Sequence, residues 1–216
     1  MKKYVLIQAF TLAEVLVTLL IIGVVAALTV PQMIQNTQSN QFKVAWKKAY
    51  SSYTLATNLL MEENGGTMEG LCAATGATCI RDKFLTKLNY VRKCDVWSNA
   101  LTSDCFPTGI HNYDGALSGW NGESAAVLND GTTVLFYLYH PNCDSSNYNP
   151  CGSSGAADYC GFITVDVNGF AMPNVFGKDI FHINIHKNGL RPCDTGAGCV
   201  IGSGTGYSCG TYNLLN

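Results

Sequence analysis

A long apolar segment near the N-terminus constrains this chain more than any other feature of its sequence. From Phe10 to Val30 it carries a single charged residue, Glu14. As a helix this segment would be about 32 Å long, which matches the hydrocarbon thickness of a bilayer. Lys2 and Lys3 precede it without an acidic residue, so the positive-inside bias predicts a cytoplasmic N-terminus and places the rest of the chain outside.

Three interpretations of this segment compete. A secretory signal peptide would be cleaved after Val25-Ala26-Ala27 and would release a soluble protein that begins at Leu28. An uncleaved anchor would keep the whole segment. Neither interpretation explains Glu14, because a carboxylate within a membrane-spanning helix costs on the order of 2.5–3.5 kcal/mol on insertion scales.

The third interpretation gives Glu14 a partner. If residues 1–9 were removed as a leader peptide, the new α-ammonium group of Phe10 would lie one helical turn before Glu14. Opposite charges attract weakly in water but strongly in a medium of low dielectric constant. The ammonium group of a neighbouring subunit can therefore neutralise this carboxylate, which predicts helices stacked side by side in a fixed axial register.

These residues resemble the N-terminal motif of the type IV pilins and of the pseudopilins of type II secretion systems. The shared features are a short basic leader, the small residue Ala9, the stretch FTLAEVL that begins at Phe10, and Pro31 near the end of the apolar helix. The resemblance implies that a prepilin peptidase cleaves between Ala9 and Phe10 and methylates the Phe10 amine, which keeps its charge. It also implies roles in assembly for Phe10, Glu14 and Pro31.

The resemblance further implies a function, partners and a location. We expect a structural subunit of a type IV pilus or a type II secretion pseudopilus, which passes once through the cytoplasmic membrane and later joins a filament in the periplasm or outside the cell. The expected partners are prepilin peptidase, other pilin or pseudopilin subunits, an inner-membrane assembly platform and membrane lipid. The choice between pilus and pseudopilus, and between major and minor subunit, stays open. A second class also stays open, a membrane-anchored binding module for adhesion or ligand capture.

The pattern after Pro31 predicts that the helix continues. Apolar residues recur at three- and four-residue steps, at Phe42, Trp46, Ala49, Tyr53, Ala56 and Leu60. Pro31 predicts a kink, and Asn64-Gly65-Gly66 predicts the end of the helix. We therefore expect one helix from Phe10 to Glu63, with residues 10–31 in the membrane or filament core and residues 32–64 as an amphipathic part that packs on a head domain.

The head, residues 65–216, is predicted to contain a four-stranded antiparallel sheet. Its apolar runs end at Asn-Gly and Asp-Gly turns, a pattern typical of hairpins. The expected strands are residues 125–128, 133–139, 161–167 and 180–186. The expected fold class is therefore α+β, and a long helix laid on such a sheet is the pilin-like fold that the resemblance implies.

A helical insert is predicted in the connection between residues 65 and 123. One face combines Ile80, Phe84, Leu88 and Val91. Its other residues include five bases and one acid, which are Arg81, Lys83, Lys87, Arg92, Lys93 and Asp82. Such a face can bind DNA, but the net charge of −2 and the lack of a series of stacking aromatic residues favour the solvated face of a packed helix. We therefore do not expect nucleic acid as a partner.

Two sets of residues in the head offer metal ligands. His182 and His186, with His140 or His111, can be considered for zinc, but residues four apart on a strand are about 13 Å apart, too far to share one ion. Three oxygen ligands for calcium, Asp166, Asn168 and Asp179, surround a turn. The EF-hand pattern is incomplete there, so we expect a structural turn and no metal or cofactor. The chain also has no recognisable catalytic motif, and an enzyme is not expected.

The ten cysteines all follow the apolar segment and predict a head stabilised by disulfides. They are Cys72, Cys79, Cys94, Cys105, Cys143, Cys151, Cys160, Cys193, Cys199 and Cys209. Their spacings suit disulfide-bonded loops better than zinc knuckles. Only local pairs are predictable, and we expect Cys72 to pair with Cys79 and Cys94 with Cys105.

Overall fold

The computed structural model describes residues 11–95, 105–118, 124–144, 158–193, 199 and 204–215 of the 216-residue chain. The chain divides into two compact units, residues 1–41 and residues 42–216. Helix α1, Leu12–Glu63, begins in the first unit and ends in the second. The predicted long helix is thus present, and it runs without interruption across Pro31.

The described part of the first unit is entirely helical apart from Thr11, and all its side chains whose burial is known are exposed. Within the described residues, α1 is the helix long and apolar enough to cross a membrane, judged by length and composition. This finding agrees with the expectation of a single membrane-spanning helix and leaves its orientation untested.

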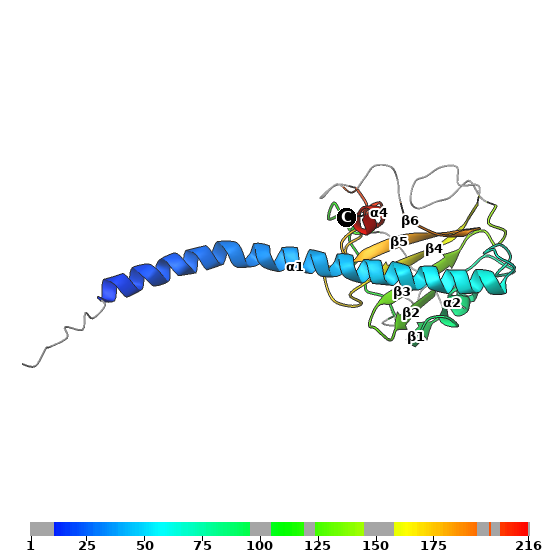
Figure 1. Cartoon of the computed structure of the whole chain (residues 1–216), viewed down its shortest axis with the longest axis horizontal. Helices are drawn as coiled ribbons and strands as arrows, with labels where there is room; N and C mark the ends of the chain where they lie inside the picture. The colour runs from blue at the N-terminus through cyan, green and yellow to red at the C-terminus, as the bar shows by residue number, and fades with distance from the viewer. Residues whose placement is uncertain are drawn as a thin grey trace, which may run out of the picture. The chain divides into compact units, whose positions relative to one another are not determined.

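In the second unit, one stripe of α1 is buried against the sheet. Trp46, Tyr53, Ala56 and Leu60 are each 0–1% exposed, as their helical spacing predicted. Partly buried residues of the same stripe, Phe42 and Ala49, pack against the same core. This part of α1 crosses one face of the sheet (Figure 1).

The predicted helix end is also confirmed. Gly65 and Gly66 follow Glu63 with φ angles of 72° and 88°, a conformation that glycine adopts at low cost. The amide of Gly66 donates to the Met61 carbonyl at 2.7 Å, which satisfies a carbonyl of the last helical turn.

The sheet has six antiparallel strands in the order β1-β2-β3-β4-β5-β6 (Figure 1). The strands are β1 Tyr90–Cys94, β2 Ser124–Leu128, β3 Thr133–Leu138, β4 Tyr159–Asp166, β5 Ile180–His186 and β6 Gly189–Pro192. The four expected strands correspond to β2 to β5, so the α+β class is confirmed. Strands β1 and β6, which form the two edges, are not predicted by the apolar pattern of the sequence.

Both faces of the sheet are covered. On β5, Phe181, Ile183 and Ile185 belong to the core under α1, whereas Ile180 belongs to a second cluster that contains Phe106 and Phe176. The side chains of this strand therefore alternate between two buried faces. His182, Asn184 and His186 on the face of Ile180 are 0–3% exposed.

The predicted helical insert is shorter than expected. Helix α2 spans Thr78–Leu85, and Val91 lies instead on the edge strand β1, where it is 73% exposed. The reason is that the chain turns after Leu85 and pairs in extended form with β2. A last helix, α4, spans Cys209–Leu215 and contacts β5.

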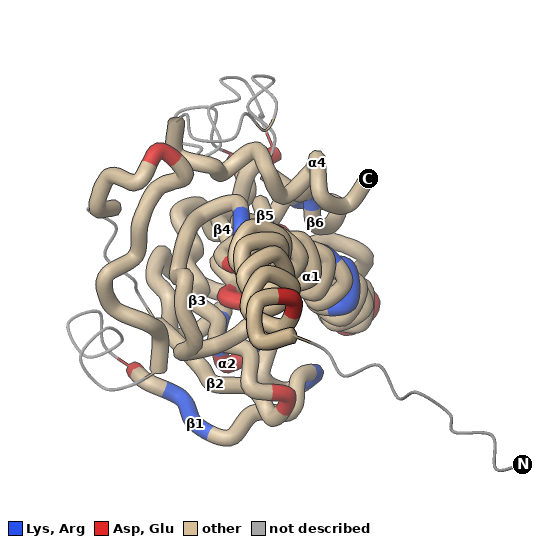
Figure 2. Tube along the Cα trace, turned by 90° about the vertical axis from the view of Figure 1, so that its left-hand side faces the viewer, with Lys and Arg blue, Asp and Glu red and all other residues tan. Residues whose placement is uncertain are grey.

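The expectation of one basic face on the helical insert is also wrong. Arg81 is fully buried, and its guanidinium forms ion pairs with Asp82 at 2.7 Å and Asp95 at 2.6 Å. Arg92 and Lys93 lie on β1 rather than on the helix, in the blue stretch of that strand in Figure 2. The five bases therefore do not form one helical surface.

Candidate functional site

The single charged residue of the apolar segment caps its own helix. The Thr11 amide and hydroxyl donate to Glu14 Oε2 at 2.9 and 2.8 Å, and the Glu14 amide donates to the Thr11 hydroxyl at 3.2 Å. These reciprocal bonds are a capping box, which satisfies amides that have no partner within the helix. The motif Thr-x-x-Glu that signals such a cap is visible in the sequence, although the cap is not among the predictions made from it.

The capping bonds use only part of the hydrogen-bonding capacity of the Glu14 carboxylate, so they are compatible with its expected role in assembly. A carboxylate has about four lone-pair sites, and the cap uses only the Oε2 atom. Ala9 and Phe10 lie outside the described residues, so the expected pair between the Phe10 amine and Glu14 stays a prediction.

The first unit presents apolar side chains on all sides. Leu20, Ile21 and Ile22 are each 57–67% exposed, and because consecutive residues lie about 100° apart around a helix, they face different sides of it. Soluble monomers rarely expose contiguous apolar patches of more than a few hundred Å². This surface is therefore the strongest candidate for a functional contact within the described residues of this unit.

The threonines of this segment are compatible with an apolar environment. The hydroxyls of Thr18, Thr29 and Thr37 each donate to the backbone carbonyl four residues earlier, at 2.8–2.9 Å. Their donor groups are thus satisfied within the helix. A membrane or a packed helix bundle requires this, because neither supplies water to a polar group.

The histidines considered for zinc lie in different environments. Their partners are Thr164 Oγ1 for His182 at 2.6 Å, Asp158 Oδ1 for His186 at 3.0 Å, Asp144 Oδ1 for His140 at 4.0 Å and the Gly115 carbonyl for His111 at 3.1 Å. Burial lowers the pKa of His182 to about 3, so this imidazole is neutral at physiological pH. Burial also lowers the pKa of His186, although the hydrogen bond with Asp158 opposes that shift.

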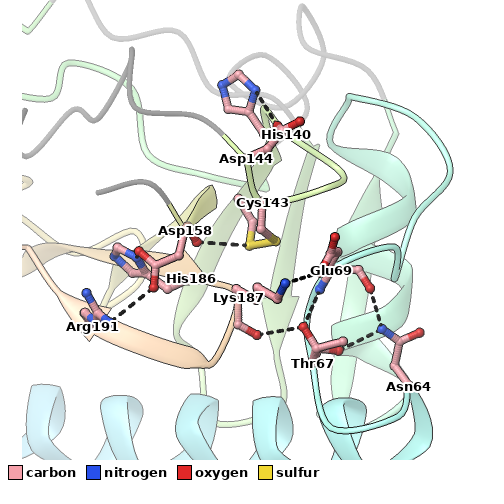
Figure 3. The surroundings of a disulfide bond; sticks show 11 residues. Asn64, Thr67, Glu69, His140, Cys143, Asp144, Asp158, His186, Lys187 and Arg191 are labelled. Atoms are coloured by element: carbon pink, nitrogen blue, oxygen red, sulfur yellow. Dashed lines mark hydrogen bonds and ion pairs between the residues drawn. A yellow bond between two sulfur atoms is a disulfide. The ribbon is translucent and has the colours of Figure 1, made fainter. Parts of the chain in front are cut away.

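An ionic cluster lies beside one disulfide of the head. Figure 3 shows Asp158 between His186 and Arg191, with its Oδ2 atom 3.2 Å from the guanidinium. Burial raises the pKa of Asp158, but the hydrogen bond and charge of His186 and the charge of Arg191 outweigh it and leave the pKa below its usual value. The cluster joins the start of β4 to β5 and β6.

Four disulfides lie in the described residues. They are Cys72–Cys79, Cys94–Cys105, Cys143–Cys160 and Cys199–Cys209. The first two are the local pairs expected from the sequence. Cys193 is also disulfide-bonded, and Cys151 lies outside the described residues. The bridges join loop segments to α2, β1, β4 and α4.

The structure brings together the three residues that were considered as oxygen ligands for calcium. Asp166 ends β4, Asn168 lies in the turn that follows, and Asp179 directly precedes β5. Asp179 accepts the amides of Asn174 and Val175 at 2.8 and 2.7 Å. Burial, and next the charge of Asp179, raise the pKa of Asp166 to about 9.

No family model, curated protein or solved structure matches this chain. The described residues define an α+β protein with a six-stranded antiparallel sheet, disulfide-bonded loops and an apolar N-terminal helix of membrane-spanning length.

Proposed function

We propose that this chain is a structural, non-enzymatic subunit of a type IV pilus or a type II secretion pseudopilus and that it polymerises through its N-terminal helix. The observation that carries the proposal is the combination of an apolar, exposed helix with one carboxylate at its start, Glu14. The resemblance of the N-terminal motif supplies the class of filament.

An apolar helix exposed on all sides needs an apolar environment. A bilayer provides one before assembly, and the helices of neighbouring subunits provide another within a filament. Lipid tails are as apolar as leucine. The transfer of the helix from the bilayer to the filament therefore depends on close van der Waals packing between helices. Gly23 and Ala27, one helical turn apart, favour close approach, and a side chain at Gly23 would meet nothing within the chain itself.

In this proposal Glu14 has two roles. It caps its own helix through Thr11, and its remaining acceptor sites bind the α-ammonium group of Phe10 in a neighbouring subunit after cleavage at Ala9. A charge pair in a medium of low dielectric constant fixes the register of its partners, because a shifted helix would leave both charges unpaired.

The proposal also gives the head a location. Disulfides form and persist in oxidising compartments, which agrees with a head in the periplasm or outside the cell and an N-terminus in the cytoplasm. The partners in this proposal are prepilin peptidase, other pilin or pseudopilin subunits, the inner-membrane assembly platform and membrane lipid.

The first test is the N-terminal mass of the full-length protein recovered from membranes of cells that express a prepilin peptidase. We expect a chain that begins at N-methylated Phe10. A chain that begins at Leu28 would identify a cleaved secretory signal, and an intact Met1 would identify an anchor. Either result would overturn the proposal and favour the binding-module class.

The second test separates the two roles of Glu14. Glu14→Gln keeps an oxygen that can accept the Thr11 bonds but removes the charge, whereas Glu14→Ala removes both. We expect both variants to insert in the membrane and both to lose filament incorporation. Glu62→Ala, which removes an exposed carboxylate elsewhere on α1, is the matched control and should assemble normally. Normal assembly of Glu14→Gln would show that the cap, and not the charge, matters.

A further inference from the structure

The turn between β4 and β5 contains buried oxygen atoms that have no hydrogen-bond donor. The atoms are Asp166 Oδ2, Asn168 Oδ1 and Asn174 Oδ1, each without a partner among the described residues. The side chains of Asp166 and Asn174 are 0% and 5% exposed. A buried acceptor without a donor costs about 1–3 kcal/mol, and more when it is charged, so three such atoms in one turn require an explanation.

The backbone holds the residues of this turn together. Asp166 pairs with Ile180 in the β4–β5 ladder, and the Val167 amide donates to the Asp179 carbonyl at 2.9 Å. Asp179 in turn accepts the Asn174 amide at 2.8 Å. Asn174 has a φ angle of 54°, a left-handed conformation that asparagine tolerates better than most residues. Asp166, Asn174 and Asp179 are therefore neighbours, although they are distant in sequence.

The hydrogen bonds that the Asn168 side chain donates fix the orientation of its amide group. Its Nδ2 atom donates to the Ala171 and Met172 carbonyls at 3.0 and 3.1 Å, so exchanging the nitrogen and oxygen positions would lose both bonds. The oxygen is the atom left without a donor. The amide of Asn168 also donates a hydrogen bond to the Asp179 carboxylate, which favours its charged form.

No positive side chain balances the two carboxylates. Among the ion pairs of the described residues, none includes Asp166 or Asp179. The adjacent Lys178 is exposed and lies 6.0 Å from the ring centre of Tyr113. The turn thus contains two buried carboxylates and two amide oxygens, and no ion pair with a basic side chain among the described residues balances the carboxylates. Oxygen atoms of this kind are the ligands that a hard divalent ion prefers.

We propose that the turn between β4 and β5 is a calcium site, with side-chain oxygens of Asp166, Asn168, Asn174 and Asp179 as ligands. Calcium is favoured over magnesium because it accepts several protein oxygens in irregular geometry, whereas magnesium keeps most of its waters. The EF-hand spacing that the sequence lacks is not required, because Asn174 and Asp179 reach the site through the fold. The bound ion would tie the end of β4 to the segment before β5. This proposal does not depend on the proposed function.

The test uses the full-length protein in detergent micelles, first treated with EGTA and then dialysed. Calorimetric titration with CaCl2 at neutral pH should show one strong site, and MgCl2 should bind at least 100-fold more weakly. Calcium at about 100 times its Kd should raise Tm by about 5–10 °C, because it binds the folded state only.

Two variants locate the ion. Asp166→Asn keeps the size of the side chain and removes its charge, and Asn174→Gly removes the amide oxygen and keeps the left-handed backbone available. Both should weaken calcium binding at least 100-fold. Asp114→Asn, which changes an exposed carboxylate in another turn of the head, is the control and should bind as the unmodified protein does.

The competing explanation is that a proton, rather than a metal ion, satisfies the two carboxylates. The EGTA-treated protein would then show no heat of binding and no Tm shift with CaCl2, and this result would overturn the proposal. Unchanged binding in both variants would place the ion elsewhere and would overturn it too. If Asp166→Asn fails to fold, the titration of the unmodified protein and of Asn174→Gly still decides the question.

Discussion

The indole ring of Trp46 stacks on the ring of Phe181, with their centres 4.6 Å apart and their planes inclined by 19°. The indole nitrogen also donates to the Gly210 carbonyl at 2.9 Å. Through this one side chain, α1 contacts strand β5 and the C-terminal helix α4. The part of α1 in the second unit is therefore an integral part of the head.

Replacement of Trp46 should test this relationship. Trp46→Ala removes both the stack and the hydrogen bond and should lower the free energy of unfolding by about 3–5 kcal/mol. Trp46→Phe keeps an aromatic ring and should cost less, because it loses the indole hydrogen bond and part of the packing. Denaturant unfolding of the full chain in detergent measures both values. Val44→Ala, at a position 68% exposed, should change little, and an equal effect there would contradict this assignment.

Arg81 should be a structural residue rather than a ligand-binding one. Besides its ion pairs, its guanidinium donates to the Cys94 carbonyl at 2.5 Å. Arg81→Met should cost about 3 kcal/mol of stability, since it leaves buried acceptors without their donor. Lys83→Met, at an exposed position of the same helix, is the control. Comparable losses for the two variants in denaturant unfolding would show that the burial of Arg81 contributes nothing.

The disulfides should differ in their contributions. Cys143–Cys160 closes a loop with a sequence separation of 17, and Cys72–Cys79 closes one of 7. In the chain-entropy model the longer loop stabilises by about 0.8 kcal/mol more, because its closure removes more freedom from the unfolded chain. Paired Cys→Ala variants, compared by thermal unfolding under oxidising conditions, measure the difference. A larger loss from the Cys72–Cys79 pair would contradict the entropic explanation.

The head should lose stability in acid through His182. Its pKa is lowered to about 3 by burial among Phe162, Phe176 and Tyr207, whereas in the unfolded chain it is about 6.5. Between these values the unfolded state binds one more proton, so stability falls by about 1.4 kcal/mol for each unit that the pH decreases.

His182→Gln should flatten this dependence, which denaturant unfolding at a series of pH values between 7 and 4 would measure. His140→Gln replaces a partly exposed histidine of the same head and should leave the slope unchanged. An unchanged slope in His182→Gln would assign the acid sensitivity to other groups.

The sequence alone determined the features that depend on neighbouring residues. The stripe through Trp46, Tyr53 and Leu60 predicted the buried face of α1, and Gly65 with Gly66 predicted where the helix ends. The turn at residues 129–131 predicted the hairpin of β2 and β3. In each case periodicity or turn geometry restricts the backbone within a few residues, so the information is local. The capping box of Thr11 and Glu14 is equally local, since the motif Thr-x-x-Glu signals it.

Only the tertiary structure decided the features whose partners are distant in sequence. The edge strand β1 was predicted as part of a helix, because Val91 continues the spacing of Ile80 and Phe84, and pairing with β2 overrides that pattern. Arg81 was assigned to a solvated face, yet Asp95 and the Cys94 carbonyl hold it inside the head. The sequence does not place Asn174, a ligand in the proposed calcium site, close to Asp166, because only the pairing of β4 with β5 does so. Strand pairing and the burial of charged groups depend on which segments meet in space, and spacing along the chain does not contain that information.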